Sequence, residues 1–360
     1  MPEEILSATL RAIRPVSQEH AAAAGARAAD LAVPPGSLGR LLDLSVRLAA
    51  IQRTLRPTFP RKAVVVMAGD HGVVHQGVSA FPAEVTPQMV ANFVAGRAAI
   101  NALAGAAGAR VLVVDVGVAA DLSGLTGSGA VIDRKVRLGT MDLSQGAAMT
   151  REQAVASIAA GIGVVESALQ DGLDLLGTGD MGIGNTTPST CLACVFTAHT
   201  PAEVTGRGTG IDDEALRRKT AVVAQALERN RPDPTDPLGT LAKVGGLEIG
   251  GIAGVMLGGA RAGLPVLVDG FISTAAALVA CALAPDTRDY LVAAHRSQEP
   301  GHRIMLEHLG LTPLLDLDLR LGEGTGAALA MPLVDGAAAL LREMATFAEA
   351  GVTEGGGGRP

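Results

Sequence analysis

The sequence predicts an α/β protein built on a doubly wound, mostly parallel sheet. Short apolar runs alternate with segments of helical periodicity along most of the chain. The apolar runs are almost continuously hydrophobic, which is typical of parallel strands buried on both faces. Most of these runs end in a polar or glycine-rich loop, and in doubly wound sheets ligands bind beyond the carboxyl ends of the strands. The functional residues are therefore expected in those loops.

Six apolar runs are predicted to form strands. Each is bounded by turn-forming residues and is too short for a typical helix. They are Lys62–Ala68, Arg110–Val116, Leu173–Leu176, Pro265–Val268, Asp289–Ala293 and Pro313–Leu319.

The segments between these runs have helical spacing: Pro87–Ala104, Arg151–Gln170, Asp212–Arg229 and Gly326–Ala348. Thr150, with Gln153 three residues later, forms a capping-box signature at the start of the second. The first 55 or so residues are helical without a strand signal, and Pro34–Leu41 (PPGSLGRL) interrupts them. We expect a small helical domain from residues 1–58 and 327–350, a large α/β domain from 59–326, and a disordered tail at 351–360.

Composition excludes several classes of function. The 360 residues carry a net charge of −7 without a Lys/Arg cluster, which argues against nucleic acid as a partner. The apolar stretch Phe271–Pro285 is too short to span a membrane and is expected to be a buried helix. Three cysteines cannot build a disulfide framework, so a cytoplasmic location is expected. Cys191 and Cys194 are interpreted as small core residues.

The most informative motif is LLGTGDMGIGNTTPST, from Leu175 to Thr190. An apolar strand runs into a glycine-rich loop, and Pro188 is expected to open a helix. Exposed N–H groups at a helix N-terminus bind phosphate well. The expected phosphate-binding residues are Gly182, Gly184, Asn185, Thr186 and Thr187, with Lys219 as counter-charge. GRGTG, at 206–210, is a second candidate anion site.

The residues alone also allow other interpretations of these motifs. GTGDMG also fits the dinucleotide pattern GxGxxG, with Glu203 about 20 residues beyond it, which would indicate a nicotinamide-dependent oxidoreductase. A non-catalytic nucleotide sensor would need only the phosphate site. Glu323 in RLGEGTG is either a general base or an acid that stabilises a helix N-terminus.

Two further loops carry polar clusters. His71 and His75 in AGDHGVVHQG suit a metal site less well than a cluster of hydrogen bonds that orders the loop. His295, Ser297 and His302, in AHRSQEPGH, either bind a substrate carboxylate or hold their own loop in place.

In combination, these motifs resemble one family closely. AGDHGV, VTPQMVANF, GIGNTTPST, KVGGLEIGGIAGVMLGGARAGLPVLVDGF, AHRSQEPGH and RLGEGTGAALAMPLV follow one another in a fixed order. The ordered set is similar to nicotinate-nucleotide–dimethylbenzimidazole phosphoribosyltransferases of the cobalamin lower-ligand pathway. The resemblance implies a Rossmann-like domain with a helical domain from both chain ends, a homodimer, and neither cofactor nor metal. It also implies transfer of 5-phosphoribose from nicotinate mononucleotide to 5,6-dimethylbenzimidazole, with inversion at the anomeric carbon.

The resemblance also implies roles for individual residues. Glu323 would be the general base that takes a proton from the benzimidazole, and Leu321 would line the slot for that ring, with Phe81, Gln88 and Met89 nearby. Ser297 and Gly208 would contact the nicotinate end of the donor. Asp180 stands where some family members have Glu, so its carboxylate is one methylene shorter, and it is ranked as a second catalytic candidate.

Overall fold

The computed structural model describes residues 1–353 and is organised around one sheet of six parallel strands. The strands lie in the order β3-β2-β1-β4-β5-β6, so the chain starts in the middle and winds outwards in both directions. They are β1 (Lys62–Gly69), β2 (Ala109–Gly117), β3 (Ile132–Asp133), β4 (Leu175–Met181), β5 (Val266–Val268) and β6 (Leu291–Ala293). The predicted α/β class with a doubly wound parallel sheet is confirmed.

Strand β1 shows why the central strands are continuously apolar. Ala63, Val65 and Met67 face one hydrophobic core, and the alternate residues Val64, Val66 and Ala68 face the other. All six are fully buried, because helices cover both faces of the sheet.

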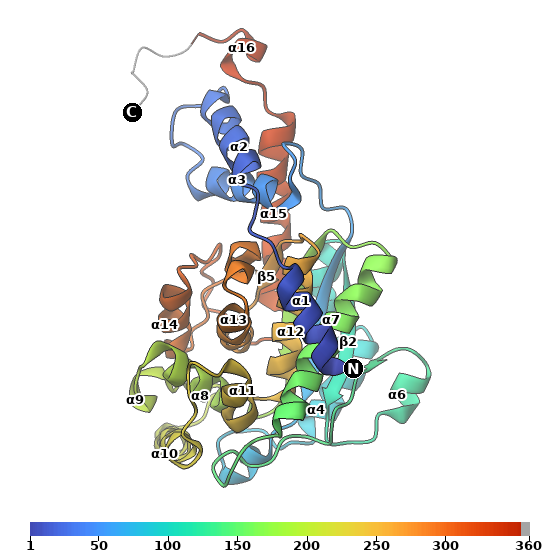
Figure 1. Cartoon of the computed structure of the whole chain (residues 1–360), viewed down its shortest axis with the longest axis vertical. Coiled ribbons are helices and arrows are strands. Elements are labelled where there is room, and N and C mark those ends of the chain that lie inside the picture. The colour runs from blue at the N-terminus through green and yellow to red at the C-terminus, as the bar shows by residue number, and fades with distance from the viewer. Residues whose placement is uncertain (354–360) are drawn as a thin grey trace.

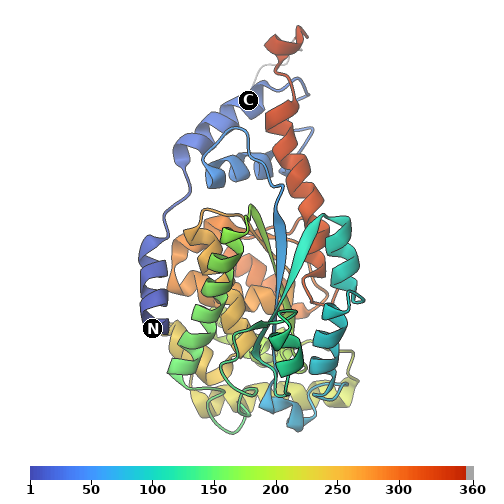
Figure 2. The ribbon, with the colours of Figure 1, turned by 90° about the vertical axis from the view of Figure 1, so that its right-hand side faces the viewer.

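The helices form two layers around the sheet (Figure 2). One layer contains α7 (Arg151–Gln170) and α12 (Leu247–Arg261), and the other contains α4 (Val85–Val94), α5 (Ala99–Ala106) and the first part of α15 (Thr325–Glu343). Helices α7 and α12 cross closely: a Cβ atom at Gly161 would lie 1.9 Å from the Gly251 carbonyl oxygen. Small residues are therefore required at this crossing, in keeping with the glycine-rich, aromatic-poor composition.

The other helices surround these layers. They are α1 (Pro2–Ala12), α2 (Gln18–Asp30), α3 (Arg40–Gln52), α6 (Ser123–Gly127), α8 (Thr186–Thr197), α9 (Pro201–Val204), α10 (Asp213–Asn230), α11 (Pro237–Val244), α13 (Phe271–Leu283), α14 (Pro300–Leu309) and α16 (Phe347–Ala350), with 3₁₀ turns η1 (Gly72–Gln76) and η2 (Pro285–Tyr290).

Helices α2 and α3 pack against the end of α15, away from the sheet (Figure 1). Ala24, Ala28, Ala49 and Leu341 form their small core. Helix α1 differs from the expectation that placed it in this unit: it packs on α7 and α12, because Leu6 on its apolar face joins the core beside the sheet. The boundaries at residues 58 and 327 stay predictions. Of the predicted tail, residues 354–360 lie outside the described part.

Two local predictions were wrong. Pro313–Leu319 forms no regular strand and makes only an isolated bridge from Leu315 to His295; Asp318 there has a positive φ of 55°, which interrupts an extended chain. The sixth strand is instead β3, at the opposite edge. The predicted helix Pro87–Ala104 is divided into α4 and α5 at Gly96, whose φ is 72°.

Two apolar segments bear on the membrane question. The stretch Val85–Ala106 has a mean hydropathy of 1.2 and the length of a membrane span, but it is these two separate helices. Helix α13 is buried, as predicted for Phe271–Pro285.

Cys191 and Cys194 lie in α8 and are buried, as expected for core residues. Burial raises the pKa of Cys191 well above its ordinary value and that of Cys194 to about 12, so neither is a reactive thiolate.

Candidate active site

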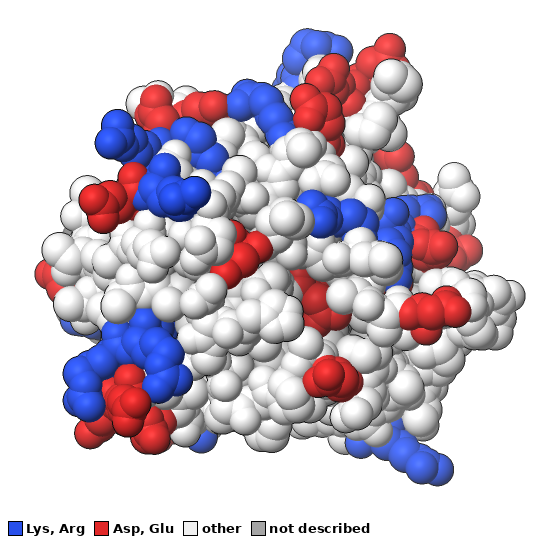
Figure 3. All heavy atoms as spheres, turned by 90° about the horizontal axis from the view of Figure 1, so that it is seen from below, with Lys and Arg blue, Asp and Glu red and all other residues white. Residues whose placement is uncertain are grey.

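Polar residues from several strand ends meet at the carboxyl edge of the sheet, around a cavity of about 230 Å³. Seen from this end, most of the surface is uncharged, with only isolated acidic side chains near its middle (Figure 3). The cavity is lined by Phe81, Asp180, Asn185, Thr186, Gly208, Thr209, Gly270, Phe271, Ile272, His295, Ser297, Glu299, Arg320, Leu321 and Gly322.

The structure brings half of the predicted site residues to this cavity. Asp180, Asn185, Thr186, Gly208, Ser297, Phe81 and Leu321 line it. Glu323 follows the lining residue Gly322 and is buried, and Lys219 lies behind Thr186. Gly182, Gly184, Thr187, Gln88 and Met89 do not line it: Gly182 faces Gly69 and His71, Gly184 faces Val74, Thr187 is fully buried, and Gln88 and Met89 lie on α4.

Strand β4 is longer than predicted, and this changes the position of Asp180. The strand continues through Met181, so Gly177, Gly179 and Asp180 belong to the buried sheet rather than to a loop. GTGDMG therefore does not form the turn after a strand that a dinucleotide site requires, and that interpretation was wrong.

The carboxyl group of Asp180 faces the cavity and accepts a hydrogen bond of 2.9 Å from the Asn185 side chain. Burial, reinforced by the negative charges of Asp269, Glu248 and Glu323, raises the pKa of Asp180 well above its ordinary value, although the Asn185 bond lowers it. A clustered, desolvated acid of this kind favours a cationic ligand, which relieves the repulsion.

Glu323 lies in a strained turn next to Asp180. Its φ is 61°, between Gly322 at 84° and Gly324 at 91°, and its backbone N–H donates to the Asp180 carbonyl oxygen at 3.2 Å. A left-handed non-glycine residue costs about 1–3 kcal/mol and is held only by surrounding contacts. The Glu323 carboxylate accepts from the Ile100 N–H at the start of α5, at 3.3 Å.

Burial raises the pKa of Glu323, the Ile100 bond opposes this rise, and the charge of Asp269 adds to it. A carboxylate with a raised pKa is a stronger base than an exposed one, as general base catalysis requires.

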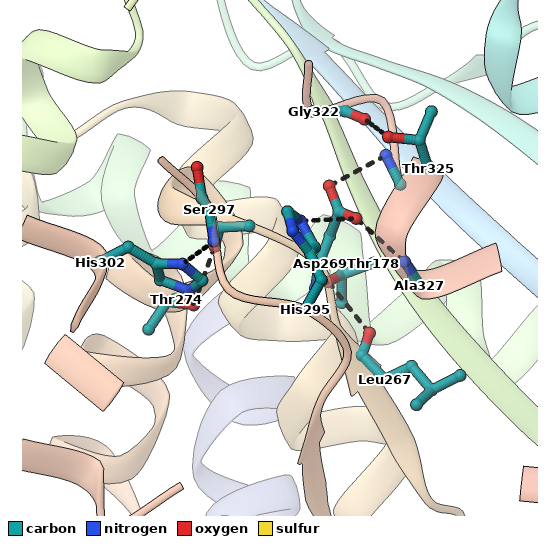
Figure 4. Close-up of polar contacts among 12 residues, drawn as sticks. Thr178, Leu267, Asp269, Thr274, His295, Ser297, His302, Gly322, Thr325 and Ala327 are labelled. Carbon is teal, nitrogen blue, oxygen red and sulfur yellow. Dashed lines mark hydrogen bonds and ion pairs between the residues drawn. The ribbon is translucent and has the colours of Figure 1, made fainter. Parts of the chain in front are cut away.

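Asp269 holds the start of α15, directly after Glu323, and Figure 4 shows it between His295 and Ala327. It is fully buried directly after β5, and its two oxygens accept from the N–H groups of Gly324 (3.3 Å) and Ala327 (3.0 Å) at the start of α15. Burial raises the pKa of Asp269, while His295, whose Nε2 lies 3.8 Å away, lowers it. Sequence reasoning missed Asp269, although its place at the end of an apolar run, in VLVDGF, was a signal.

A buried cation lies on the other side of the cavity. Lys219, on α10, is fully buried, and its Nζ donates to Thr186 Oγ1 (2.8 Å) and to the Gly206 carbonyl oxygen (3.0 Å). Burial lowers the pKa of Lys219 to about 8, although the charge of Glu299 opposes this effect. Glu299 accepts from the Gly208 N–H at 2.8 Å, and Arg320 donates to the Gly208 carbonyl oxygen.

His302 supports the loop that carries Ser297 (Figure 4). The Ser297 N–H donates to Nδ1 of His302 at 2.8 Å, and the other ring nitrogen lies 2.9 Å from Thr274 Oγ1. Because the Thr274 hydroxyl donates to the Gly270 carbonyl, it accepts from His302, which fixes the neutral Nε2–H tautomer. Burial lowers the pKa of His302 to about 3, so it holds the loop as a neutral ring.

The open side of the cavity is apolar. Phe81 is 51% exposed and Leu321 is 57% exposed, which is unusual for large hydrophobic side chains. The loop of Phe81 is tied to the Gly208 loop, because the Ala80 N–H donates to Thr209 Oγ1 at 3.0 Å. Among residues 1–353, no three His, Cys, Asp or Glu side chains are grouped so as to hold a metal ion.

Comparisons with known proteins show the family to which the chain belongs. Residues 13–352 match the family model described as "Phosphoribosyltransferase". A nicotinate-nucleotide–dimethylbenzimidazole phosphoribosyltransferase of Chloroflexus aurantiacus is 54% identical over 351 residues, covering 98% of this chain and 99% of the relative. One of Geobacter metallireducens has the same identity and coverage. The crystal structure of the Thermus thermophilus protein of that name superposes with a TM-score of 0.89 at 51% identity, covering 94% of this chain and 100% of the other. The chain therefore belongs to the nicotinate-nucleotide–dimethylbenzimidazole phosphoribosyltransferase family.

Proposed function

We propose that this enzyme transfers 5-phosphoribose from nicotinate mononucleotide to 5,6-dimethylbenzimidazole, giving α-ribazole 5′-phosphate and nicotinate for cobalamin synthesis. The observation that carries the proposal is the meeting of two opposite charges at one cavity. Lys219 and the Gly208 turn form the subsite that binds an anion, while Asp180 and the Glu323 turn supply the acidic groups on the other side.

The phosphate is expected to bind against Thr186 and Gly208. Lys219 donates a 2.8 Å hydrogen bond to Thr186 Oγ1, which leaves the Thr186 hydroxyl free to donate to the phosphate next to this positive charge. Arg320 is a second cation at the Gly208 loop. Charge-assisted hydrogen bonds of this kind are about twice as strong as neutral ones. This subsite does not include Gly182 and Gly184, which the sequence motif suggested but which do not line the cavity. Ser297 stays a predicted contact of the nicotinate end.

The acidic side of the cavity suits the rest of the donor. The nicotinate ring nitrogen is cationic in the mononucleotide, so it leaves without a proton while the anomeric carbon becomes positively charged. Asp180 is placed to stabilise this charge, and a bound cation lowers the pKa of the desolvated carboxyl so that it ionises. Attack by the base from the face opposite the leaving nicotinate gives inversion.

Glu323 is proposed as the general base. One benzimidazole nitrogen attacks the sugar, and the other must lose its proton; Glu323 accepts it. The exposed faces of Phe81 and Leu321 form the expected walls of the ring slot, and a contact with Gln88 and Met89 on α4 stays a prediction. The homodimer, the cytoplasmic location, the absence of a cofactor and the choice of acceptor stay predictions.

The assay combines purified protein with nicotinate mononucleotide and dimethylbenzimidazole and follows nicotinate release and the riboside phosphate by mass. Turnover is expected without an added metal. Binding of the nucleotide without turnover would instead support the sensor hypothesis. Competition among several bases identifies the preferred acceptor.

Replacement of Lys219 by Met is expected to raise the KM for nicotinate mononucleotide about 10- to 150-fold with a smaller change in kcat. The substitution removes the charge behind Thr186, and a hydrogen bond to a charged group is worth about 1.5–3 kcal/mol. Lys243→Met on α11 is the matched control, because Lys243 only donates to the Arg231 carbonyl away from the cavity. An unchanged KM for Lys219→Met would remove Lys219 from the phosphate subsite.

Replacement of Gly179 by Ala tests whether the close contact between β4 and the Glu323 turn is needed for catalysis. A Cβ atom at Gly179 would lie 2.4 Å from the Glu323 carbonyl oxygen, so the turn must move. We expect kcat to fall about tenfold or more, because small displacements of a catalytic group are costly. Gly163→Ala in α7 is the control, since a Cβ there meets no atom within 4 Å.

A further inference from the structure

A second pair of buried charged residues lies beside the cavity without taking part in the mechanism above. His71 follows β1, and Glu248 lies in the first turn of α12. Both side chains are fully buried, and His71 Nε2 is 2.8 Å from Glu248 Oε1. In the described part of the chain, His71 Nδ1 and Glu248 Oε2 have no hydrogen-bond partner. Such a costly arrangement is rarely retained for stability alone.

The two side chains form an ion pair. Burial lowers the pKa of His71, but the charge and hydrogen bond of Glu248, together with the charge of Asp70, outweigh burial and raise it above its ordinary value. His71 therefore keeps its proton to higher pH than an exposed histidine.

The pair packs against the chain that leads from β4 to α8. A Cβ atom at Gly182 would lie 3.3 Å from His71 Nε2 and 2.2 Å from the Gly69 carbonyl oxygen. At Gly246, a Cβ would lie 2.6 Å from the His71 ring and 2.7 Å from Glu248 Oε2. His71 thus packs against the segment between Asp180 and Thr186 at Gly182.

The pair also contributes to the charge around Asp180. The acids whose charges raise the pKa of Asp180 come from three elements: Asp269 after β5, Glu323 before α15, and Glu248 on α12. His295, after β6, lines the same cavity. Of these acids, Glu248 has the closer buried partner: His71 Nε2 lies 2.8 Å from its Oε1, whereas His295 Nε2 lies 3.8 Å from Asp269 Oδ1.

We infer that the His71–Glu248 pair is a positioning element of the transferase: it holds the Gly182–Asn185 segment and fixes a negative charge near Asp180. The inference rests on the proposed function, because it acts through Asp180. Neither residue touches the substrate in this proposal. The pair explains why AGDHG and KVGGLEIGG, far apart in sequence, both carry ionisable residues at glycine-rich turns.

The test is the pH dependence of kcat/KM for nicotinate mononucleotide in Glu248→Gln. The amide keeps the size of the side chain and removes its charge. We expect kcat/KM to fall at least about tenfold. The acid limb, to which Asp180 contributes, should move to lower pH by about half a unit or more, because Glu248, and not its partner His71, is among the charges that raise the pKa of Asp180.

Two variants separate charge from packing. Glu248→Asp keeps the charge, so its acid limb should stay at the wild-type pH even if kcat/KM falls. Glu228→Gln, an exposed residue of α10, should leave both quantities unchanged. A uniform loss in Glu248→Gln with an unmoved acid limb, or wild-type kcat/KM, would overturn the inference.

Two further measurements keep the test decisive. If Glu248→Gln does not fold, the test uses the double variant His71→Asn with Glu248→Gln, which leaves no buried charge in the pair. Its acid limb of kcat/KM should show the same shift to lower pH. Nitrogen NMR of the histidine rings, with His71 identified by its loss in His71→Asn, should show a protonated His71 at neutral pH that becomes neutral in Glu248→Gln. Wild-type enzyme without turnover rejects the proposed function, whereas wild-type turnover with an unshifted variant rejects only this inference.

Discussion

Replacement of Glu323 by Gln is expected to lower kcat by about 10²–10⁴-fold, the usual contribution of a general base. The amide fits the same space and still accepts a hydrogen bond from the Ile100 N–H, so the strained turn should persist. The KM for nicotinate mononucleotide should change little, because Glu323 acts on the incoming base. The measurement is steady-state riboside phosphate formation at saturating concentrations of both substrates.

The pH profile gives an independent check on Glu323. The base works in its ionised form, and burial with the charge of Asp269 raises its pKa. Wild-type activity should therefore fall as the pH drops through a value above that of an ordinary glutamate. The residual activity of Glu323→Gln should lack this dependence. Glu343→Gln, on the exposed end of α15, is the control; a Glu323→Gln rate within a factor of two of wild type would contradict the assignment.

Replacement of Asp269 by Ala is expected to lower kcat by about 100-fold, although Asp269 touches no substrate. It removes the acceptor of the Gly324 and Ala327 N–H groups and so releases the turn that holds Glu323. A catalytic group displaced by about 1 Å loses a factor of this size. Each N–H left unpaired in the interior also costs about 1–3 kcal/mol, so the melting temperature should fall as well.

Asp269→Asn separates positioning from charge. The amide oxygen still accepts one of the two bonds, but the negative charge that raises the pKa of Glu323 is gone. The acid limb of kcat should consequently move to lower pH. Asp171→Ala, at an exposed helix end, controls for the loss of an acid. A destabilised Asp269→Asn enzyme whose acid limb stays in place would show that Asp269 only supports the fold.

The sequence predicted those strands and helices that can be recognised from residues close together in the chain, such as an apolar run or a capping box. Lys62–Ala68 is a strand because a continuous apolar run of that length suits only a buried strand. Arg151–Gln170 is a helix with its capping box in place, since Thr150 accepts from the Gln153 N–H. Pro313–Leu319 was misjudged because the positive φ of Asp318, 55°, interrupts the extended chain, which keeps only the isolated bridge at Leu315.

By itself, the sequence determined the fold class, the family and the motifs and segments that contain Asp180, Thr186, Lys219 and Glu323. These follow from periodicity and from ordered motifs, which are properties of neighbouring residues in the chain. Only the tertiary structure decided that Asp180 belongs to a strand, that Asp269 holds the Glu323 turn, and that His71 pairs with Glu248. The reason is physical: burial and the pairing of charges 177 residues apart depend on how the strands are wound, and no local pattern encodes them.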